Sequence, residues 1–331
     1  MEGRINLHTK LNYWRRVFAA YRKGANSQVT FWHEKPAVNE EMNFNDPSTG
    51  YYMTFYDKTL YLGPFDKKGV PLLDYKGIIG AQYNPIAIAQ YGLGLYNRYV
   101  KEQKKEYLDK FVTQCDWLLD NLEKNKYGLY VWMHHFDWEY QGILKAPWQS
   151  SLAQGCGISA LLRCYLATGE KKYLDASALA FESFKKDVSE GGVSFTDEHG
   201  YLWFEEYIIK PYSHVLNGFI WSLFGVYDFY LVTGSDEAKR LYELGVKTIA
   251  DNLNKFDIGF WSLYSLSPTT MKLIASPFYH SLHIVQLDIL CRITNEKKFL
   301  EFRERWQNYE KSWVKRNYAL LYKIIFKIFY Y

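Results

Sequence analysis

Residues 214–235 read HVLNGFIWSLFGVYDFYLVTGS, an apolar run that ends in a glycine and a serine. A helix that is apolar on nearly all sides is expected to be packed between other elements. Three more runs share this pattern: residues 86–100, 151–170 and 283–296. Each run carries an amide residue, and these amides recur at intervals of roughly 65 residues, the length of two helices with their connections. They are Gln90, Gln154, Asn217 and Gln286.

Each apolar run is followed by a segment with charges on one face and apolar residues on the other. Such amphipathic helices are expected to lie outside the apolar ones. The segments are residues 104–123, 171–188, 236–253 and 297–313. The sequence therefore predicts an all-α protein, an (α/α) toroid of about four helix hairpins over residues 81–312.

Short stretches with strand-like alternation precede three of the apolar runs, at residues 127–138, 191–207 and 258–266. We expect them to form short β-hairpins at one rim of the toroid, together with the first turns of the inner helices. Residues 1–80 do not fit the repeat and predict a small N-terminal arm of strands and loops laid against the toroid. Residues 313–331 form a basic, aromatic tail.

The composition favours a protein that binds sugars. Aromatic residues make up 19% of the 331 residues, and tyrosine and tryptophan combine a face for stacking with a hydrogen-bonding tip. The net charge of +4 is mild and spread along the chain, so nucleic acid is not an expected partner. The four cysteines form no CxxC pair and predict buried free thiols. With no apolar leader visible near the start, we expect a cytoplasmic location.

The tail WVKRNYALLYKIIFKIFYY at 313–331 mixes four basic residues with rings and aliphatic side chains. It is too short and interrupted to span a bilayer. Two alternatives stay open: the tail lies at the cytoplasmic membrane surface, as a peripheral contact, or it packs on the protein's own helices. A homodimer is also left open.

Polar and aromatic residues gather at the predicted rim. Glu205, Glu206, Tyr207, Tyr212 and His214 lie directly before one inner helix. Later rim segments add Tyr264, Tyr279 and His280. His134, His135 and Asp137 are adjacent and lack the separated spacing of a zinc site, so no metal is expected.

Four segments carry a resemblance to a known family: YNPIAIAQYGL at 83–93, AQGCGISALLRCYL at 153–166, EEY at 205–207 with VLNGFIWSLFGVYD at 215–228, and YHSLHIVQL at 279–287. The chain from about residue 80 to 312 resembles the C-terminal catalytic domain of the heparosan and heparan-sulfate D-glucuronyl C5-epimerases. The resemblance implies conversion of D-glucuronate to L-iduronate within an acidic, heparosan-like polysaccharide, without a cofactor.

The resemblance also implies site residues. Glu206 and Tyr207 match the family's acid–tyrosine pair, and Tyr264 and Tyr279 match its other two essential tyrosines. The residues expected to contact substrate are Tyr83, Glu205, Lys210, Tyr212, His214, Asn217, Lys272 and His280.

Inversion at C5 needs a base on one face of the sugar, a proton donor on the other, and hydrogen-bond donors around the carboxylate. We expect Tyr279 and Glu206 to be the opposed pair, with Tyr207 and Tyr264 supporting the carboxylate or relaying protons. A tyrosine could serve if its pKa fell, and Glu206 could serve if desolvation raised its pKa.

The chain departs from the family in two respects. The accessory β-sandwich is missing, and LYSLSP at 263–268 lacks the arginine that follows the second tyrosine. A cation for the uronate carboxylate must then come from Lys210, Lys272, Arg163 or His280.

Three alternatives remain. A uronate polysaccharide lyase would abstract the same proton. An inverting glycoside hydrolase would pair Glu206 with a second carboxylate such as Asp137. A non-catalytic saccharide-binding protein would retain the fold with a decayed site.

Overall fold

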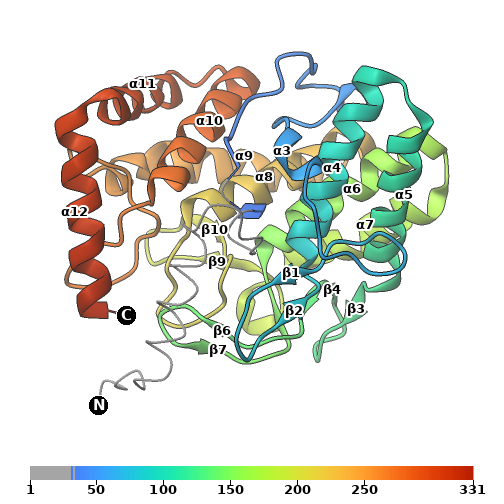
Figure 1. Ribbon diagram of the computed structural model, residues 1–331, viewed down its shortest axis with the longest axis horizontal. Coiled ribbons are helices and arrows are strands. Elements are labelled where there is room, and N and C mark those ends of the chain that lie inside the picture. Colours follow the sequence, from blue (N-terminus) through green and yellow to red (C-terminus); the bar gives the residue numbers. More distant parts are fainter. Residues whose placement is uncertain (1–30, 33, 331) are drawn as a thin grey trace.

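The computed structural model describes residues 31–32 and 34–330, and in these ranges eight helices form four hairpins arranged as a toroid (Figure 1). The predicted fold class is confirmed. The inner helices are α4 (Pro85–Glu102), α6 (Ser151–Thr168), α8 (Leu216–Thr233) and α10 (Pro277–Thr294). The outer helices are α5 (Lys105–Asp120), α7 (Lys171–Phe181), α9 (Asp236–Asn252) and α11 (Lys297–Lys311). The start of α10 lies six residues before the predicted run because Ser276 caps the helix and Pro277 begins it.

Glycines allow the inner helices to approach one another closely. A Cβ atom on Gly225 of α8 would lie 2.4 Å from the carbonyl oxygen of Gly155 on α6. No side chain fits at that distance, so α6 and α8 cross backbone to backbone. This contact explains why the apolar runs are rich in small residues.

The repeated amides are buried and join neighbouring elements. Gln154 accepts a hydrogen bond from the backbone N–H of Trp132 at 2.9 Å, and Gln286 donates to the carbonyl of Asn217 at 3.0 Å. Because buried polar groups need partners, these amides fix the positions of hairpins and helices relative to one another.

The N-terminal arm closes the ring between the first and last inner helices. Glu40 pairs with Arg292 of α10 at 2.6 Å, while Glu41 pairs with Lys101 of α4 at 2.7 Å. The arm contains the 3-10 helix η1 (Pro47–Thr49), helix α3 (Tyr56–Thr59) and strands β1 (Leu73–Asp74) and β2 (Ala81–Gln82). The part of the arm at 1–30 lies outside the described residues.

The run at 51–63 belongs to the arm, which was expected to contain strands, but its only strand-like pairing is one isolated bridge, between Met53 and Val38. Residues 50–53 are all buried, whereas a strand on a surface would bury alternate residues. The run passes through the interior, so both of its faces are covered. Tyr52 reaches the core and donates to Asp228 at 2.7 Å.

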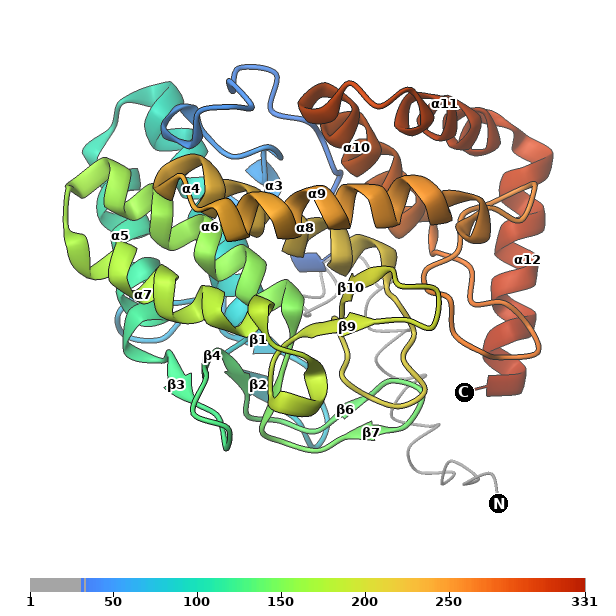
Figure 2. The same ribbon diagram turned by 180° about the vertical axis from the view of Figure 1, so that it is seen from behind.

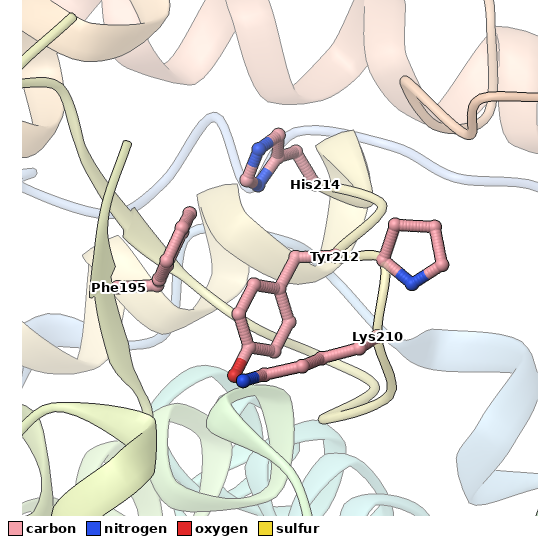
Figure 3. A pocket seen from close by; sticks show the side chains of 5 residues that line it. Phe195, Lys210, Tyr212 and His214 are labelled. Carbon is pink, nitrogen blue, oxygen red and sulfur yellow. The ribbon is translucent and has the colours of Figure 1, made fainter. Parts of the chain in front are cut away.

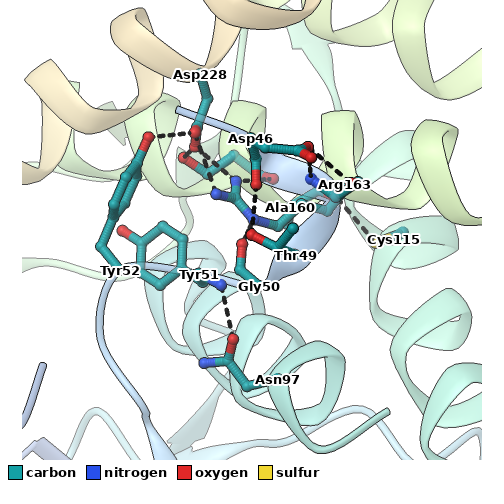
Figure 4. A network of polar contacts seen from close by, with 12 residues as sticks. Asp46, Thr49, Gly50, Tyr51, Tyr52, Asn97, Cys115, Ala160, Arg163 and Asp228 are labelled. Carbon is teal, nitrogen blue, oxygen red and sulfur yellow. Dashed lines mark hydrogen bonds and ion pairs between the residues drawn. The ribbon is translucent and has the colours of Figure 1, made fainter. Parts of the chain in front are cut away.

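A buried ion pair links the arm to the inner helices (Figure 4). Arg163 of α6 and Asp228 of α8 are fully buried and lie 2.6 Å apart. Arg163 also donates to the carbonyl of Gly50 at 2.7 Å, and Ser159 donates to Asp228 at 2.6 Å. Every charged atom of the pair therefore finds a partner without water.

Short antiparallel strands gather at one side of the helices (Figure 2). The first group comprises β3 (Glu123–Lys124), β4 (Tyr130–Val131), β5 (Met133–His134), β6 (Trp138–Glu139), β7 (Ile143–Leu144) and β8 (Trp148–Gln149). The second is the hairpin of β9 (Ser194–Thr196) and β10 (Leu202–Phe204). Residues 258–266 form only isolated bridges, including Val215 with Ser265, and no strand.

The tail forms helix α12 (Trp313–Tyr330), which lies along the side of the toroid (Figure 1). Ala319 and Phe326 are its buried residues. None of the helices in the described ranges is long and apolar enough to cross a lipid bilayer. Cys115, Cys156 and Cys164 are buried thiols and Cys291 is half-buried.

Candidate active site

Three chain segments place the predicted catalytic residues. Glu206 and Tyr207 directly follow β10. Tyr264 is held by backbone hydrogen bonds to Leu273 at 2.8 Å and from Leu216 at 3.1 Å. Tyr279 lies in the first turn of α10, where its N–H donates to the capping hydroxyl of Ser276 at 3.3 Å.

These three segments, together with Tyr140 from the turn between β6 and β7, bring four tyrosine rings together. The ring centroids of Tyr264 and Tyr279 are 4.9 Å apart with an edge-to-face geometry. Tyr140 stacks on Tyr207 at 4.1 Å and meets the edge of Tyr264 at 6.4 Å. We call Tyr140, Tyr207, Tyr264 and Tyr279 the tyrosine cluster.

Glu206 is the carboxyl group beside the cluster. It is 4% exposed, and its Oε2 has no hydrogen-bond partner in the described residues. A Cβ on Gly218 would lie 2.1 Å from this Oε2, so only glycine fits in this turn of α8. Burial raises the pKa of Glu206 to about 7, the charge of Glu205 adds to the rise, and a hydrogen bond with Tyr207 opposes it. A carboxyl with this pKa exchanges protons near neutral pH.

Burial also raises the pKa values of the tyrosines, which keeps their hydroxyl groups protonated. Burial raises the pKa of Tyr207 and of Tyr264 well above the usual value, and the charge of Glu206 adds to both shifts. The same two causes raise the pKa of Tyr279. These hydroxyls are therefore neutral proton donors at pH 7, and raised acidity of a tyrosine is not seen. The acid–base group near neutral pH is therefore the Glu206 carboxyl with its raised pKa, and not a tyrosine with a lowered pKa.

Tyr140 was not among the site residues predicted from the sequence. Its hydroxyl donates to Ser213 at 3.0 Å and accepts from Gln141 at 3.2 Å, and Gln141 also contacts Ser267. Burial raises the pKa of Tyr140 to about 12. Its position two residues after the predicted rim segment 127–138 was a usable signal, since that segment is rich in aromatic residues.

A second missed pair lies near Tyr279. Asn84 donates to the hydroxyl of Tyr75 at 2.8 Å, and the charge that Tyr75 can carry contributes to the raised pKa of Tyr279. The neighbouring Tyr83, which was predicted to contact substrate, is exposed, donates to Asp66 at 2.9 Å and lies 5.3 Å from the ring of Trp117. The structure does not bring Tyr83 into the tyrosine cluster.

Side chains of the loop that follows Tyr207 help to line an outer pocket of about 640 Å³ (Figure 3). Phe195, Lys210, Pro211, Tyr212 and His214 line it. Ser213, between two of these residues, instead points to Tyr140 at 3.0 Å. The loop therefore presents one face to the tyrosine cluster and the other to the outer pocket.

Glu205 fixes this loop from within. It is fully buried, and its Oε1 lies 2.5 Å from Nδ1 of His214. The His214 ring stacks on Trp203 at 4.3 Å, although its backbone has a φ of 49°. Non-glycine residues adopt that conformation only when their surroundings hold them there. Glu205 thus holds His214 in the pocket wall and does not itself line the pocket.

Asn217 and His280 lie in the core, which corrects their expected place at the substrate. Asn217 is 2% exposed, and its carbonyl accepts from Gln286. His280 is fully buried, stacks on Trp261 at 3.8 Å and has both ring nitrogens occupied, by Ser262 at 2.8 Å and the Trp306 carbonyl at 3.1 Å. Burial lowers the pKa of His280 to about 4, so it is neutral at pH 7.

The expected cations take different positions. Arg163 is committed to Asp228. Lys210 borders the outer pocket, and Lys272 is exposed beside α12, where its N–H donates to Tyr322 at 3.0 Å. Lys58 is a further cation that the sequence did not single out. It is buried and lies 3.7 Å from Glu34. The charges of Lys58 and Glu206 both influence the pKa of the Cys156 thiol.

Asp137 and the nearby histidines do not form a catalytic or metal group. Asp137 is exposed and bound to Lys145 at 2.5 Å, which lowers its pKa. His134 is buried against Trp148 at 3.8 Å, whereas His135 pairs with Glu123 at the surface at 3.0 Å. Within residues 31–32 and 34–330, no three histidine, cysteine or acidic residues are grouped to hold a metal ion.

The ring of helix hairpins is a fold that solved structures with little sequence similarity to this chain also have. The solved cellobiose 2-epimerase of Bacillus thermoamylovorans has this fold, with a TM-score of 0.53 and 14% identity over 76% of this chain and 68% of that chain. The family model described as D-glucuronyl C5-epimerase C-terminus matches residues 123–308. The chain belongs to this family.

Two curated relatives are similar in sequence. The D-glucuronyl C5-epimerase of Caenorhabditis elegans is 31% identical over 225 residues, which cover 63% of this chain and 36% of that protein. An uncharacterized protein of Methanocaldococcus jannaschii is 30% identical over 205 residues, covering 61% of this chain and 64% of that protein. The chain thus spans about a third of the length of the first relative and less than two thirds of the second.

Proposed function

We propose that the protein is a D-glucuronyl C5-epimerase that converts D-glucuronate to L-iduronate within an acidic, heparosan-like polysaccharide. The observation that carries the proposal is the buried Glu206, with its pKa raised to about 7, beside neutral tyrosines. One group can take a proton near neutral pH, and the others can give one. Inversion at a carbon acid needs these two functions.

In the proposed reaction the Glu206 carboxylate removes the C5 proton, and the electron pair moves into the uronate carboxyl group. Tyr279 gives its hydroxyl proton to C5 from the opposite face and becomes a phenolate. Hydroxyl groups of the cluster stabilise the charge on the carboxyl oxygens while it develops. No cofactor takes part in this sequence of steps.

Reset of the site requires the proton on Glu206 to return to Tyr279. Glu206 and Tyr264 both influence the pKa of Tyr207, and the Tyr264 ring lies edge-on to that of Tyr279, with 4.9 Å between the ring centroids. We propose that Tyr207 and Tyr264 relay this proton. This arrangement supports the roles expected for Tyr207 and Tyr264.

We assign a second contact with the same polymer to the outer pocket. Phe195 and Tyr212 offer ring faces for a sugar, and Lys210 offers a cation for a uronate carboxylate. The loop that separates the pocket from the cluster is short, so one polysaccharide chain could reach both. We thus assign Lys210 to the carboxylate of a uronate next to the reacting sugar. At the reacting sugar, hydroxyl donors of the tyrosine cluster replace the missing arginine in part.

The lyase and hydrolase alternatives make different products. A lyase would expel the 4-linked sugar and leave an unsaturated uronate, so the chain would become shorter. The hydrolase pair of Glu206 and Asp137 is disfavoured, because Asp137 is exposed and already bound to Lys145. A non-catalytic protein would bind the polymer and exchange no C5 proton.

The test is incubation of the purified protein with unsulfated heparosan in D₂O, followed by NMR of uronate H5 and by ultraviolet absorbance. Deuterium at C5 with iduronate signals and constant absorbance is expected. Rising absorbance with shorter chains would instead establish a lyase. A polymer that binds without exchanging H5, for both heparosan and a chondroitin backbone, would refute the epimerase.

Cytoplasmic location and dimer formation stay predictions. The location is consistent with four free cysteines, and cell fractionation would test it. Size-exclusion chromatography with light scattering would give the oligomeric state.

A further inference from the structure

Helix α12 carries its apolar side chains outward. Of the nineteen large hydrophobic side chains exposed in the described residues, nine belong to this helix. Leu321, Ile324 and Ile328 are 54%, 46% and 62% exposed, and Phe329 is 73% exposed. The remaining five are Trp313, Val314, Tyr318, Leu320 and Ile325. Together we call these nine residues the apolar face.

Lysines of the same helix point toward the protein. Lys315 donates to the carbonyl of Gly259 at 2.9 Å and lies 3.8 Å from the ring centroid of Tyr309. Lys323 donates to the carbonyl of Ile274 at 2.5 Å. Tyr322 and Tyr330 accept from backbone N–H groups of Lys272 and Met271. A surface helix in water normally has the opposite arrangement, with lysines outward and aliphatic residues inward.

The arrangement is therefore stable in water only at a cost, because several leucine- and isoleucine-sized side chains remain hydrated. The polar contacts of the inner face fix the helix in this rotation. A partner that removes the apolar face from water would therefore gain free energy from burial of these side chains.

The basic charge of the tail favours an anionic partner. Residues 311–331 contain five basic residues and no acidic residue. Lys311 and Arg316 are exposed on this segment, and Lys272 is exposed next to it. A second copy docked on the same face would bring two basic helices together, which is unfavourable. An anionic lipid surface provides opposite charge around an apolar layer.

We propose that α12 binds an anionic lipid surface, with its apolar face inserted at the level of the headgroups and with Lys311, Arg316 and Lys272 at its border. This places the protein at a membrane surface through α12, a helix that is not long and apolar enough to cross the bilayer. The binding is independent of the epimerase reaction.

The test is co-sedimentation of the full chain with vesicles of phosphatidylcholine alone or mixed with phosphatidylglycerol. Binding is expected to the mixed vesicles and to decrease with salt. The double variant Ile324→Asp/Ile328→Asp is expected to bind at least about tenfold more weakly. The matched control is Leu62→Asp/Ile78→Asp on the arm, where the two side chains are 83% and 87% exposed, and it should bind like the wild type.

Two further variants separate a loss of lipid binding from a loss of folding and test the role of charge. Ile324→Ser/Ile328→Ser replaces the aspartates if the first pair melts below the wild type. Arg316→Glu should weaken binding to mixed vesicles and leave the apolar face intact. Equal binding by the wild type and both isoleucine pairs would overturn the proposal, as would a dimer in solution that these pairs dissociate while no vesicles are bound.

Discussion

Tyr140 lies parallel to Tyr207, with 4.1 Å between ring centroids and 27° between ring planes, although the two residues belong to different rim segments. Glu206 contributes to the raised pKa of Tyr207, so Tyr140 packs against a side chain that interacts with the acid. We infer that Tyr140 is a positioning residue.

Tyr140→Phe is therefore expected to keep turnover within a few-fold, because the stacked ring remains. Tyr140→Ala should lower turnover by about 100-fold, the effect of a misplaced catalytic group, and should destabilise the fold by about 3 kcal/mol. Turnover and urea unfolding measure the two effects. If the phenylalanine variant were as slow as the alanine variant, the hydroxyl itself would take part in the reaction.

Tyr279→Phe removes the proposed proton donor and little volume. Turnover is expected to fall by about 10²- to 10⁴-fold, while the melting temperature stays near that of the wild type. Exchange of H5 in D₂O is the measurement. Tyr318→Phe, an exposed tyrosine on α12, is the matched control and should show no loss. Turnover near that of the wild type in Tyr279→Phe would remove Tyr279 from the mechanism.

The pKa of Glu206 predicts how stability depends on pH. It rises from 4.5 to about 7 on folding, so between these values the native state retains a proton that the unfolded chain has lost. Stability then falls as pH rises through this window. Glu206→Gln should be more stable than the wild type at pH 8, by up to about 3 kcal/mol, and no different at pH 4.

Thermal unfolding at both pH values checks this difference, with the exposed Glu198→Gln as control. The wild-type kcat/KM should rise with pH through about 7 as Glu206 becomes a base. An equal stability difference at pH 4 and pH 8 would contradict the raised pKa.

Asp228→Asn leaves the buried Arg163 without a charged partner. We expect a loss of about 3 to 5 kcal/mol in unfolding free energy, as for other broken buried pairs. Asp109→Asn, which breaks an exposed pair with Lys105, should cost less than about 1 kcal/mol. A combined Arg163→Met/Asp228→Leu variant should lose less than Asp228→Asn alone. Equal losses from the buried and exposed pairs would contradict this account.

The outer pocket predicts an effect of polymer length. Lys210→Ala/Tyr212→Ala should raise KM for long heparosan by roughly three- to tenfold, equivalent to about 1 kcal/mol, and leave kcat unchanged. For a short oligosaccharide that fills only the tyrosine cluster, KM should not change. Lys239→Ala, exposed on α9, serves as the control. The same KM increase for both substrates would place the pocket outside the binding path.

The ring of helix hairpins could be predicted from the sequence, because its apolar and amphipathic periodicities and the spacing of its amides are local properties of the chain. The family resemblance also predicted Glu206, Tyr207, Tyr264 and Tyr279 as catalytic residues, and their catalytic roles stay predictions. Tertiary structure decided what periodicity cannot encode. Tyr140 joins the cluster through a stacking contact between distant segments, and His280 and Asn217 lie in the core because neighbouring helices cover them. The rotation of α12, which turns lysines inward and isoleucines outward, depends on carbonyl groups of the 259–274 segment that only the folded chain brings beside the helix.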